Sequence, residues 1–234
     1  MDFLSPWNSD LNFDYYIRMH EKLIGREWFI EDLSYLVLKT DYRGVLFAAE
    51  MGFGKSAIVS NIAYAGDKRL PGYPLYSKLV SIHVCRFDSH ITLKPGMFVK
   101  NMAAGIAQKF PEYGNIIHLD RMAHDYLFTE KCFEDPQGCF DFGILSPLQK
   151  MQGIPDKLIV LMDALDECIE YWHANKFTLL YEKIPRLPKF IKILCTSRNI
   201  SQIREKLPPG IILYDNPYIK EKSTEDIKQY IEFR

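Results

Sequence analysis

The sequence has no long hydrophobic run and almost no net charge, and each absence excludes a class of protein. No stretch approaches the roughly 18 consecutive apolar residues of a membrane span, and no basic segment followed by an apolar run opens the chain. The 29 Lys and Arg residues against 30 Asp and Glu leave a net charge of −1, so no global field draws the protein to polyanions. We therefore expect a soluble protein with no membrane span and no nucleic-acid partner.

Paired cysteines are also missing, because the five cysteines are scattered and none form a C-x-x-C motif. This pattern indicates neither a disulfide framework nor a zinc site. It is typical of a reducing compartment, so we predict a cytoplasmic protein. Cys132 and Cys139 are expected to be free thiols or packing residues. His83 and Cys85 alternate on one face of a strand and are expected to be structural core residues.

What is present is enough material for one large folded domain. The chain has 234 residues, 47% of them hydrophobic, with only 13 Gly and 13 Pro, so it can bury a sizeable core. Short apolar runs predict buried strands at 45–49, 79–85, 158–162, 191–196 and 211–214. Helical patterns begin at Glu27 and then cover 55–65, 96–110, 177–184 and 200–207. Such alternation predicts an α/β fold with a parallel sheet covered by helices on both faces.

Three segments interrupt this regular alternation. Residues 1–22 show no clear period and are treated as an N-terminal extension. The long connection between the second and third runs predicts an inserted element at about 111–150, because loops of that length rarely lack structure of their own. Ser223 and Asp226 have the spacing of an N-cap and its third residue, so a final helix is expected to open there.

The most informative segment, residues 49–56, reads A-E-M-G-F-G-K-S and lies between a predicted strand and a predicted helix. Backbone N–H groups in a Gly-rich turn converge on phosphates, a lysine adds charge, and the helix N-terminus directs its positive dipole at the same anion. The hydroxyl of Ser56 is placed to ligand Mg²⁺. The alternative is an ordinary Gly-rich turn, and Ala49 replaces the first glycine of the usual pattern. The predicted cofactor-binding residues here are Glu50, Met51, Gly52, Phe53, Gly54, Lys55, Ser56 and Ala57.

A second segment, residues 158–167, reads L-I-V-L-M-D-A-L-D-E and delivers acids to the carboxyl edge of the sheet, where ligands of parallel sheets bind. Asp163 is the natural Mg²⁺ partner beside Ser56. Asp166 or Glu167 could orient or deprotonate a water next to the terminal phosphate. The alternative for both is capping of the next helix.

A third strand ends in Thr196, Ser197 and Arg198. An arginine at that edge could neutralise the terminal phosphate. By itself the signal is weak, and a surface salt bridge is an equal alternative.

With the three segments in this order, the chain resembles a P-loop ATPase of the STAND class, and within it the NACHT type. Asp163-Ala164-Leu165-Asp166-Glu167 is similar to the doubled acidic motif of NACHT domains, and Thr196-Ser197-Arg198 to their sensor 1. Ile24-Gly25-Arg26-Glu27 resembles their upstream G-R-E element, which implies nucleotide contacts from Gly25 and Arg26. The segment around His83 and Cys85 looks most like NACHT-like domains of large ankyrin- or TPR-repeat scaffold proteins of the TANC type.

The resemblance covers about residues 23–234 and implies an AAA+-like, five-stranded parallel sheet with the sensor strand between the P-loop strand and the Asp163 strand. It also implies an adenine nucleotide, ATP or ADP, with Mg²⁺, and no guanine-reading N-K-x-D motif occurs. The small helical and winged-helix domains that follow in this family do not occur before Arg234. We therefore expect a nucleotide-binding domain taken from a larger protein.

The leading functional hypothesis is an ATP-binding, Mg²⁺-dependent switch for signalling or assembly, a weak ATPase in which Asp166, Glu167 and Arg198 handle the reaction. Its protein partners would be reached through flanking domains or self-association. The alternative is a scaffold domain that keeps the P-loop fold without hydrolysis. A small-molecule kinase is disfavoured because no arginine-rich lid is evident.

Overall fold

The computed structural model describes residues 25–152, 157–171, 181–214 and 218–233. The expected extension over 1–22 and the first half of the expected helix over 177–184 lie outside these ranges. Within them, no helix combines the length and the apolar character that crossing a membrane requires.

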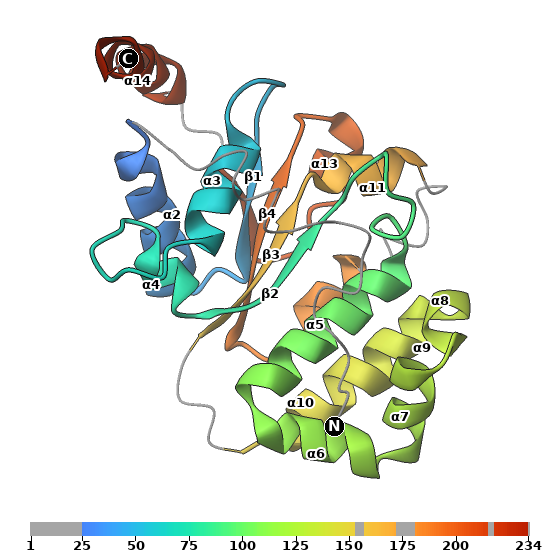
Figure 1. Ribbon diagram of the computed structural model, residues 1–234. Helices are drawn as coiled ribbons and strands as arrows, with labels where there is room; N and C mark the ends of the chain where they lie inside the picture. Colours follow the sequence, from blue (N-terminus) through green and yellow to red (C-terminus); the bar gives the residue numbers. More distant parts are fainter. Residues whose placement is uncertain (1–24, 153–156, 172–180, 215–217, 234) are drawn as a thin grey trace.

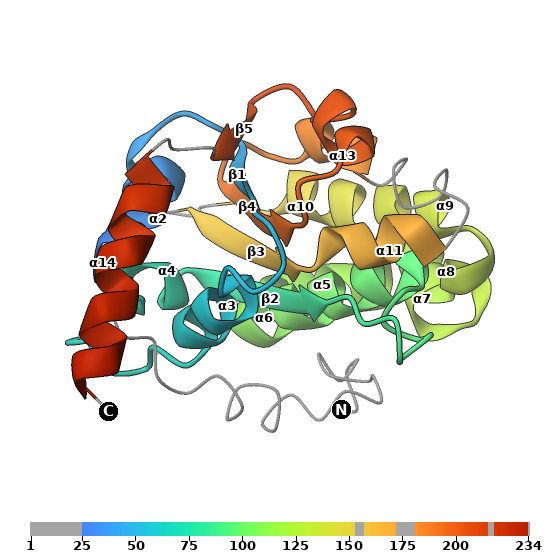
Figure 2. The ribbon, with the colours of Figure 1, turned by 90° about the horizontal axis from the view of Figure 1, so that it is seen from above.

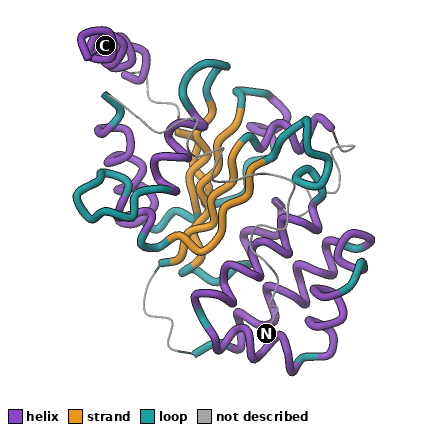
Figure 3. The backbone as a smooth tube through the Cα atoms, viewed as in Figure 1, coloured by secondary structure: helices purple, strands orange, loops and turns teal. Residues whose placement is uncertain are grey.

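One parallel sheet, drawn in orange in Figure 3, forms the centre of the described structure. Its strand order is β2-β3-β4-β1-β5. The strands are β1 (Gly44–Ala48), β2 (Leu79–Val84), β3 (Leu158–Asp163), β4 (Ile191–Ser197) and β5 (Ile211–Tyr214). Val45 pairs with Leu194 on one side and with Ile212 on the other. The predicted strands are confirmed, and so is the implied place of β4 between β1 and β3.

Helices cover both faces of this sheet, as predicted (Figures 1 and 2). On one side lie α2 (Glu27–Lys39), α3 (Lys55–Ala63) and α4 (Tyr73–Tyr76). On the other lie α5 (Pro95–Lys109), α11 (Leu165–Tyr171), a 3-10 turn (Ile184–Arg186) and α13 (Ser201–Glu205). The last helix described is α14 (Tyr218–Phe233).

The period of two along the strands divides the core between the two faces. Val45 and Phe47 of β1 belong to the cluster that includes Phe29 of α2, whereas Leu46 faces the cluster of α5 and the helices beyond it. Helix α5 lies unusually close to β2, because a Cβ added at Gly105 would be 1.9 Å from the carbonyl oxygen of Val80. A glycine is therefore needed where this helix crosses the strand.

The connection between β2 and β3 folds into a compact set of helices packed on α5. These are α6 (Pro111–Leu119), α7 (Arg121–Phe128), α8 (Lys131–Glu134), α9 (Pro136–Phe140), a π-helical stretch (Asp141–Leu145) and α10 (Ser146–Lys150). Asp120 caps α7 by accepting from the backbone N–H groups of Met122 and Ala123. Tyr113 is fully buried and donates its hydroxyl to the carbonyl of Gly143.

The predicted start of the last helix is wrong. Helix α14 begins at Tyr218, so Ser223 lies inside it rather than at its N-cap. The carboxylate of Asp226 instead forms an ion pair with Arg26, at 3.0 Å. A tertiary partner thus uses the acid that the spacing assigned to a helix cap.

The expectation of no disulfides is also wrong. Cys85 at the end of β2 is bonded to Cys168 in α11, and Cys132 in α8 is bonded to Cys139 in α9. Cys195 is a buried free thiol whose pKa is raised by burial. The first pair is 83 residues apart in the chain, so only the sheet brings its sulfurs together.

Candidate functional site

A cavity of about 480 Å³ opens at the carboxyl edge of the sheet. It lies where the loops after β1, β2, β3 and β4 meet, the edge at which open parallel sheets bind ligands. Its lining consists of Met51, Gly52, Phe53, Gly54, Lys55, Ser56, Ala57, Phe87, Asp163, Ala164, Asp166, Glu167 and Arg198. Most of the predicted site residues are therefore brought together.

The loop between β1 and α3 forms one wall of the cavity. Gly52 and Gly54 have φ angles of +81° and +82°, and a Cβ at either position would meet nothing within 4 Å. The glycines are thus needed for their backbone conformation, not for space. Gly54 leads directly into Lys55, so the unpaired N–H groups at the start of α3 open toward the cavity.

Lys55 lies over this loop with its ammonium group inside the turn. Its Nζ donates to the carbonyl oxygens of Ala49 and Glu50, at 2.7 and 2.9 Å. Burial lowers the pKa of Lys55, and the carboxylates of Asp166 and Asp163 oppose that shift. The cation is therefore held at the site by loop carbonyls and nearby acids. Ala49, which stands where the usual pattern has its first glycine, donates its N–H to the carbonyl oxygen of Ser197 in β4, at 3.1 Å.

Ser56 and Asp163 meet at the base of the cavity. The Ser56 hydroxyl donates to Oδ2 of Asp163 at 3.0 Å, and the Thr196 hydroxyl donates to Oδ1 of the same carboxylate. Asp163 is 1% exposed, so both oxygens are held by hydroxyl groups in a buried position. Adjacent ligands of an octahedral Mg²⁺, each about 2.1 Å from the ion, lie about 3.0 Å apart. The hydroxyl and the carboxylate therefore fit the hard, oxygen-ligated ion that their sequence positions suggested.

The turn after β3 has a strained backbone that orients the following acids. Ala164 has a φ of +55°, in the left-handed region that residues other than glycine rarely adopt. Its N–H donates to Thr196 Oγ1 at 3.1 Å, and its carbonyl accepts from the N–H of Glu167 at 2.9 Å. Hydrogen bonds on both sides of the residue thus stabilise this turn.

Asp166 is among the residues that line the cavity, and its carboxylate is paired with Arg198. Its two oxygens accept from the backbone N and from Nε of Arg198, at 2.7 and 2.5 Å. The carboxylate is 3% exposed, while the arginine side chain is 42% exposed and lines the cavity. The salt-bridge alternative for Arg198 is therefore present in the structure, with a buried partner.

Glu167 is held by the loop after β2. Its Oε2 accepts from the N–H of Phe87 at 2.7 Å, and its other oxygen remains for a second interaction. Burial raises the pKa of Glu167, and the hydrogen bond from Phe87 opposes this shift. Both acids lie in the first turn of α11, the position that the helix-capping alternative also predicts. A half-buried carboxyl with a raised pKa at a cavity wall is suited to proton transfer.

Gly25, Arg26 and Glu50 do not line the cavity. Arg26 lies between the loop and α14, with its guanidinium 4.9 Å from the ring centre of Phe53 and its Nε paired to Asp226. The carbonyl of Gly25 accepts from Trp28 Nε1 at 3.1 Å. Glu50 contributes its carbonyl to Lys55 and is otherwise exposed.

Two residues of the site were not among the predicted site residues, although Thr196 belongs to the segment that resembles sensor 1. Thr196 holds the carboxylate of Asp163, and Phe87 holds that of Glu167 through its backbone. Thr196 stands at the end of β4 and Phe87 just after β2, so a rule that inspects every strand end would have included both. The use of a backbone N–H by Glu167 leaves no signal in the side-chain pattern.

Comparisons with known proteins give a matching family model and similar solved structures. The family model described as "Nephrocystin 3, N-terminal" matches residues 25–198 of this chain. The structure of PCH-2 from C. elegans is similar at 14% identity with a TM-score of 0.32, over 87% of this chain and 46% of that one. The chain thus spans less than half the length of that neighbour.

Proposed function

This chain belongs to the nephrocystin 3 N-terminal family, and from that premise we propose that its domain binds a nucleoside triphosphate with Mg²⁺ in the manner of P-loop NTPases. The observation that carries the proposal is the contact between Ser56 and Asp163 beneath the cavity, 3.0 Å apart. It joins α3, the helix that follows the Gly-rich loop, to β3, the strand that ends in an acid. Those are the two parts of such a site that hold the metal ion.

In this proposal the N–H groups of the loop and of the first turn of α3 bind the β- and γ-phosphates. Lys55 exchanges the carbonyls of Ala49 and Glu50 for phosphate oxygens. The lowered pKa of this lysine does not prevent the exchange, since an incoming polyanion favours its charged form. Mg²⁺, when bound, shields phosphate charge next to Ser56 and Asp163.

For hydrolysis we propose Glu167 as the general base. The proton of the attacking water passes to its carboxylate, the water oxygen bonds to the γ-phosphorus, and the nucleoside diphosphate leaves. The N–H of Phe87 fixes one oxygen of Glu167, so the other is oriented for this step. In this step Nε of Arg198 leaves Asp166 and the guanidinium moves to the γ-phosphate. The backbone N–H of Arg198 keeps its hydrogen bond to Asp166.

The finer assignments are part of the same proposal. The NACHT-like and TANC-like patterns of residues 163–167 and 83–98 support an adenine nucleotide and a regulatory role as a switch in a larger protein. Arg26 supports such a role physically, because it joins Phe53 of the loop to Asp226 of α14. A change in the loop on nucleotide binding would reach that helix through one side chain.

Binding without hydrolysis is the second candidate, and the Asp166–Arg198 pair favours it. Arg198 and Asp166 form an ion pair, and breaking an ion pair that contains a buried carboxylate is costly in free energy. A domain that keeps the pair with nucleotide bound would respond to the ligand without turning it over. Phosphate release by the purified protein distinguishes the two candidates.

The decisive experiment is a titration of the protein with ATP and Mg²⁺, with thermal unfolding as the readout. At 100 times the dissociation constant, a ligand of the native state stabilises it by about 2.7 kcal/mol, or about 5–10 °C for a domain of this size. Lys55→Ala should abolish that shift. Lys68→Ala, which removes an exposed lysine outside the cavity lining, is the matched control and should keep it. An unchanged shift in the Lys55 variant refutes the proposed site.

A further inference from the structure

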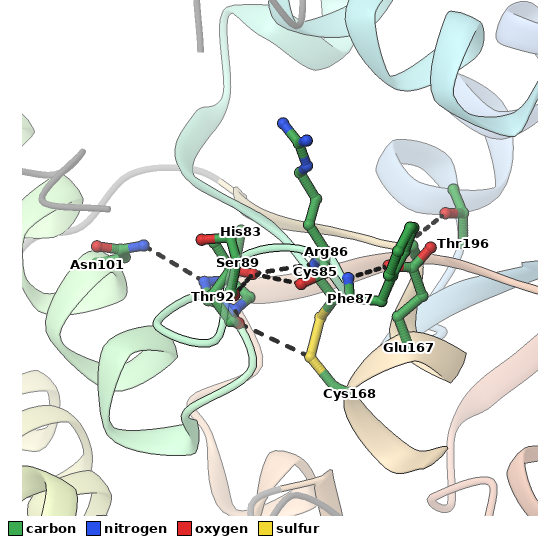
Figure 4. Close-up of a disulfide and its surroundings, with 11 residues drawn as sticks. His83, Cys85, Arg86, Phe87, Ser89, Thr92, Asn101, Glu167, Cys168 and Thr196 are labelled. Carbon is green, nitrogen blue, oxygen red and sulfur yellow. Dashed lines mark hydrogen bonds between the residues drawn. A yellow bond between two sulfur atoms is a disulfide. The ribbon is translucent and has the colours of Figure 1, made fainter. Parts of the chain in front are cut away.

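Behind the cavity wall, three side chains with metal-binding atoms lie close together and buried. They are His83 of β2, Cys85 directly after that strand and Cys168 of α11, with their ligand atoms all within 4.8 Å of one another (Figure 4). His83 and Cys85 are two positions apart, the spacing that places side chains on the same side of an extended chain. The proposed phosphate site makes no use of any of the three.

A fourth ligand atom faces this group from the following loop. The carbonyl oxygen of Thr92 lies 2.8 Å from His83 Nε2 and 3.8 Å from the sulfur of Cys168. Figure 4 shows this carbonyl between the imidazole and the disulfide. In a tetrahedral zinc site with Zn–S bonds of about 2.3 Å and Zn–O bonds of about 2.1 Å, a sulfur and an oxygen ligand are about 3.6 Å apart. The Thr92–Cys168 separation is therefore already close to a ligand–ligand distance.

The surroundings of His83 suit a metal ligand. Asn101 is 5% exposed and places Nδ2 3.3 Å from His83 Nδ1, while its own Oδ1 has no hydrogen-bond partner in the described part of the chain. Amide O and N atoms are assigned from such networks. In the disulfide form Nε2 carries the proton, because the carbonyl of Thr92 can only accept. In the metal-bound form the proton lies on Nδ1 and the amide is turned over, so that Oδ1 accepts from Nδ1–H and the lone pair of Nε2 faces the metal ion. Metal-bound histidines usually donate their second N–H in this way.

We propose that Cys85, Cys168 and His83, with the carbonyl of Thr92, form a zinc site when the disulfide is reduced. Two thiolates and an imidazole are the ligands that zinc prefers, and all three side chains are buried.

The disulfide and the zinc site exclude each other, and the chemistry balances. A dithiol reductant transfers two electrons and two protons to the Cys85–Cys168 bond and becomes a disulfide itself. Zn²⁺ then displaces the two thiol protons as it binds both sulfurs. In either state the end of β2 is joined to α11, beside the N–H of Phe87 that holds Glu167. The proposal does not depend on nucleotide binding.

The test uses Co²⁺ as a spectroscopic probe of the whole chain after reduction with a phosphine, with excess reductant removed. We expect one equivalent to produce thiolate-to-cobalt absorption in the near ultraviolet and the visible bands of tetrahedral Co²⁺, and Zn²⁺ to abolish both. Cys132→Ser/Cys139→Ser removes the other disulfide and should retain the signal. His83→Gln should weaken Co²⁺ binding at least about tenfold. A folded, reduced protein without these bands, or bands lost in the control variant, overturns the proposal.

A second measurement covers the case in which the His83 variant does not fold. The reduced wild-type protein is alkylated with iodoacetamide with and without Zn²⁺, and each cysteine is quantified by mass spectrometry. We expect Zn²⁺ to slow alkylation of Cys85 and Cys168 at least about tenfold while Cys132 and Cys139 react unchanged. Equal slowing of all four cysteines, or of none, contradicts the site.

Discussion

Thr196→Val tests the central feature of the site, the buried carboxylate of Asp163 held by two hydroxyl groups. The substitution removes one hydroxyl and almost preserves side-chain size. In the native protein this hydroxyl donates to Asp163 Oδ1 and accepts from the N–H of Ala164, at 3.1 Å. Thr196 and Asp163 are 2% and 1% exposed, so water cannot replace the lost partner without entering the core.

The size of the effect follows from these two bonds. A hydrogen bond to a charged group contributes about 1.5–3 kcal/mol, and a buried polar group left without a partner costs about 1–3 kcal/mol. Because the turn can relax in part, we expect the free energy of unfolding to fall by about 2–4 kcal/mol. For a domain of this length that lowers the melting temperature by about 4–16 °C.

The assay is urea unfolding followed by circular dichroism, with the m-value compared between variants. Ser60→Ala is the matched control, since its hydroxyl is buried in α3 and has no hydrogen-bond partner among the residues that the structure describes. It should leave the free energy of unfolding unchanged or raise it by up to about 1–3 kcal/mol, because it removes a costly buried hydroxyl. If Thr196→Val likewise does not lower the free energy of unfolding, the hydroxyl does not hold Asp163 and the account of the site is refuted.

Three further predictions concern the cavity wall, the second disulfide and the packing of α5. Glu167→Gln should keep nucleotide binding and lower phosphate release by about 10²–10⁴-fold, because an amide accepts from Phe87 but takes no proton. Because burial raises the pKa of Glu167, its protonation as the pH falls should stop wild-type phosphate release at a higher pH than protonation of an ordinary glutamate would. Unchanged phosphate release by the Gln variant would exclude Glu167 as the base. Cys132→Ser/Cys139→Ser removes a disulfide between residues only 7 apart in the chain and should lower the free energy of unfolding of the oxidised protein by about 2.5 kcal/mol. Removal of the disulfide between residues 83 apart should lower it by about 4.5 kcal/mol, and chemical denaturation measures both values. Gly105→Ala should destabilise the protein by about 3 kcal/mol in the same assay, because the added Cβ would be 1.9 Å from the carbonyl oxygen of Val80. Ala104→Gly is the packing control, and a neutral result for Gly105→Ala would contradict the close approach of α5 to β2.

Much of the architecture could be predicted from the sequence because each strand is a short apolar run closed by a breaker. The run 158–162 is bounded by Lys157 and by Asp163, and the structure adds only Asp163 itself to the strand. Helix ends were harder to predict, and the start of α14 was missed because Asp226 has a tertiary partner. A capping pattern describes what local groups can do, not which distant group competes for them.

The candidate site divides in the same way. Glycines at positive φ, Lys55 and the acids at the end of β3 are local features that were readable from spacing. The pairing of Asp166 with Arg198 and of Glu167 with Phe87 joins segments 32 and 80 residues apart. The helices after β1 and after β2 were predicted, but the spatial neighbours that decide the charge and orientation of each acid were not.

The sequence by itself determined the α/β alternation, the Gly-rich loop between β1 and α3, and the acids at the end of β3 and after it, because each is a local pattern of polarity, glycine and spacing. The tertiary structure alone decided how the cysteines pair and which residues hold each carboxylate. Cys85 and Cys168 meet only because β2 and β3 are neighbours in the sheet while some seventy residues of helices lie between them in the chain. Contacts across a sheet depend on strand order, and strand order is a property of the whole fold.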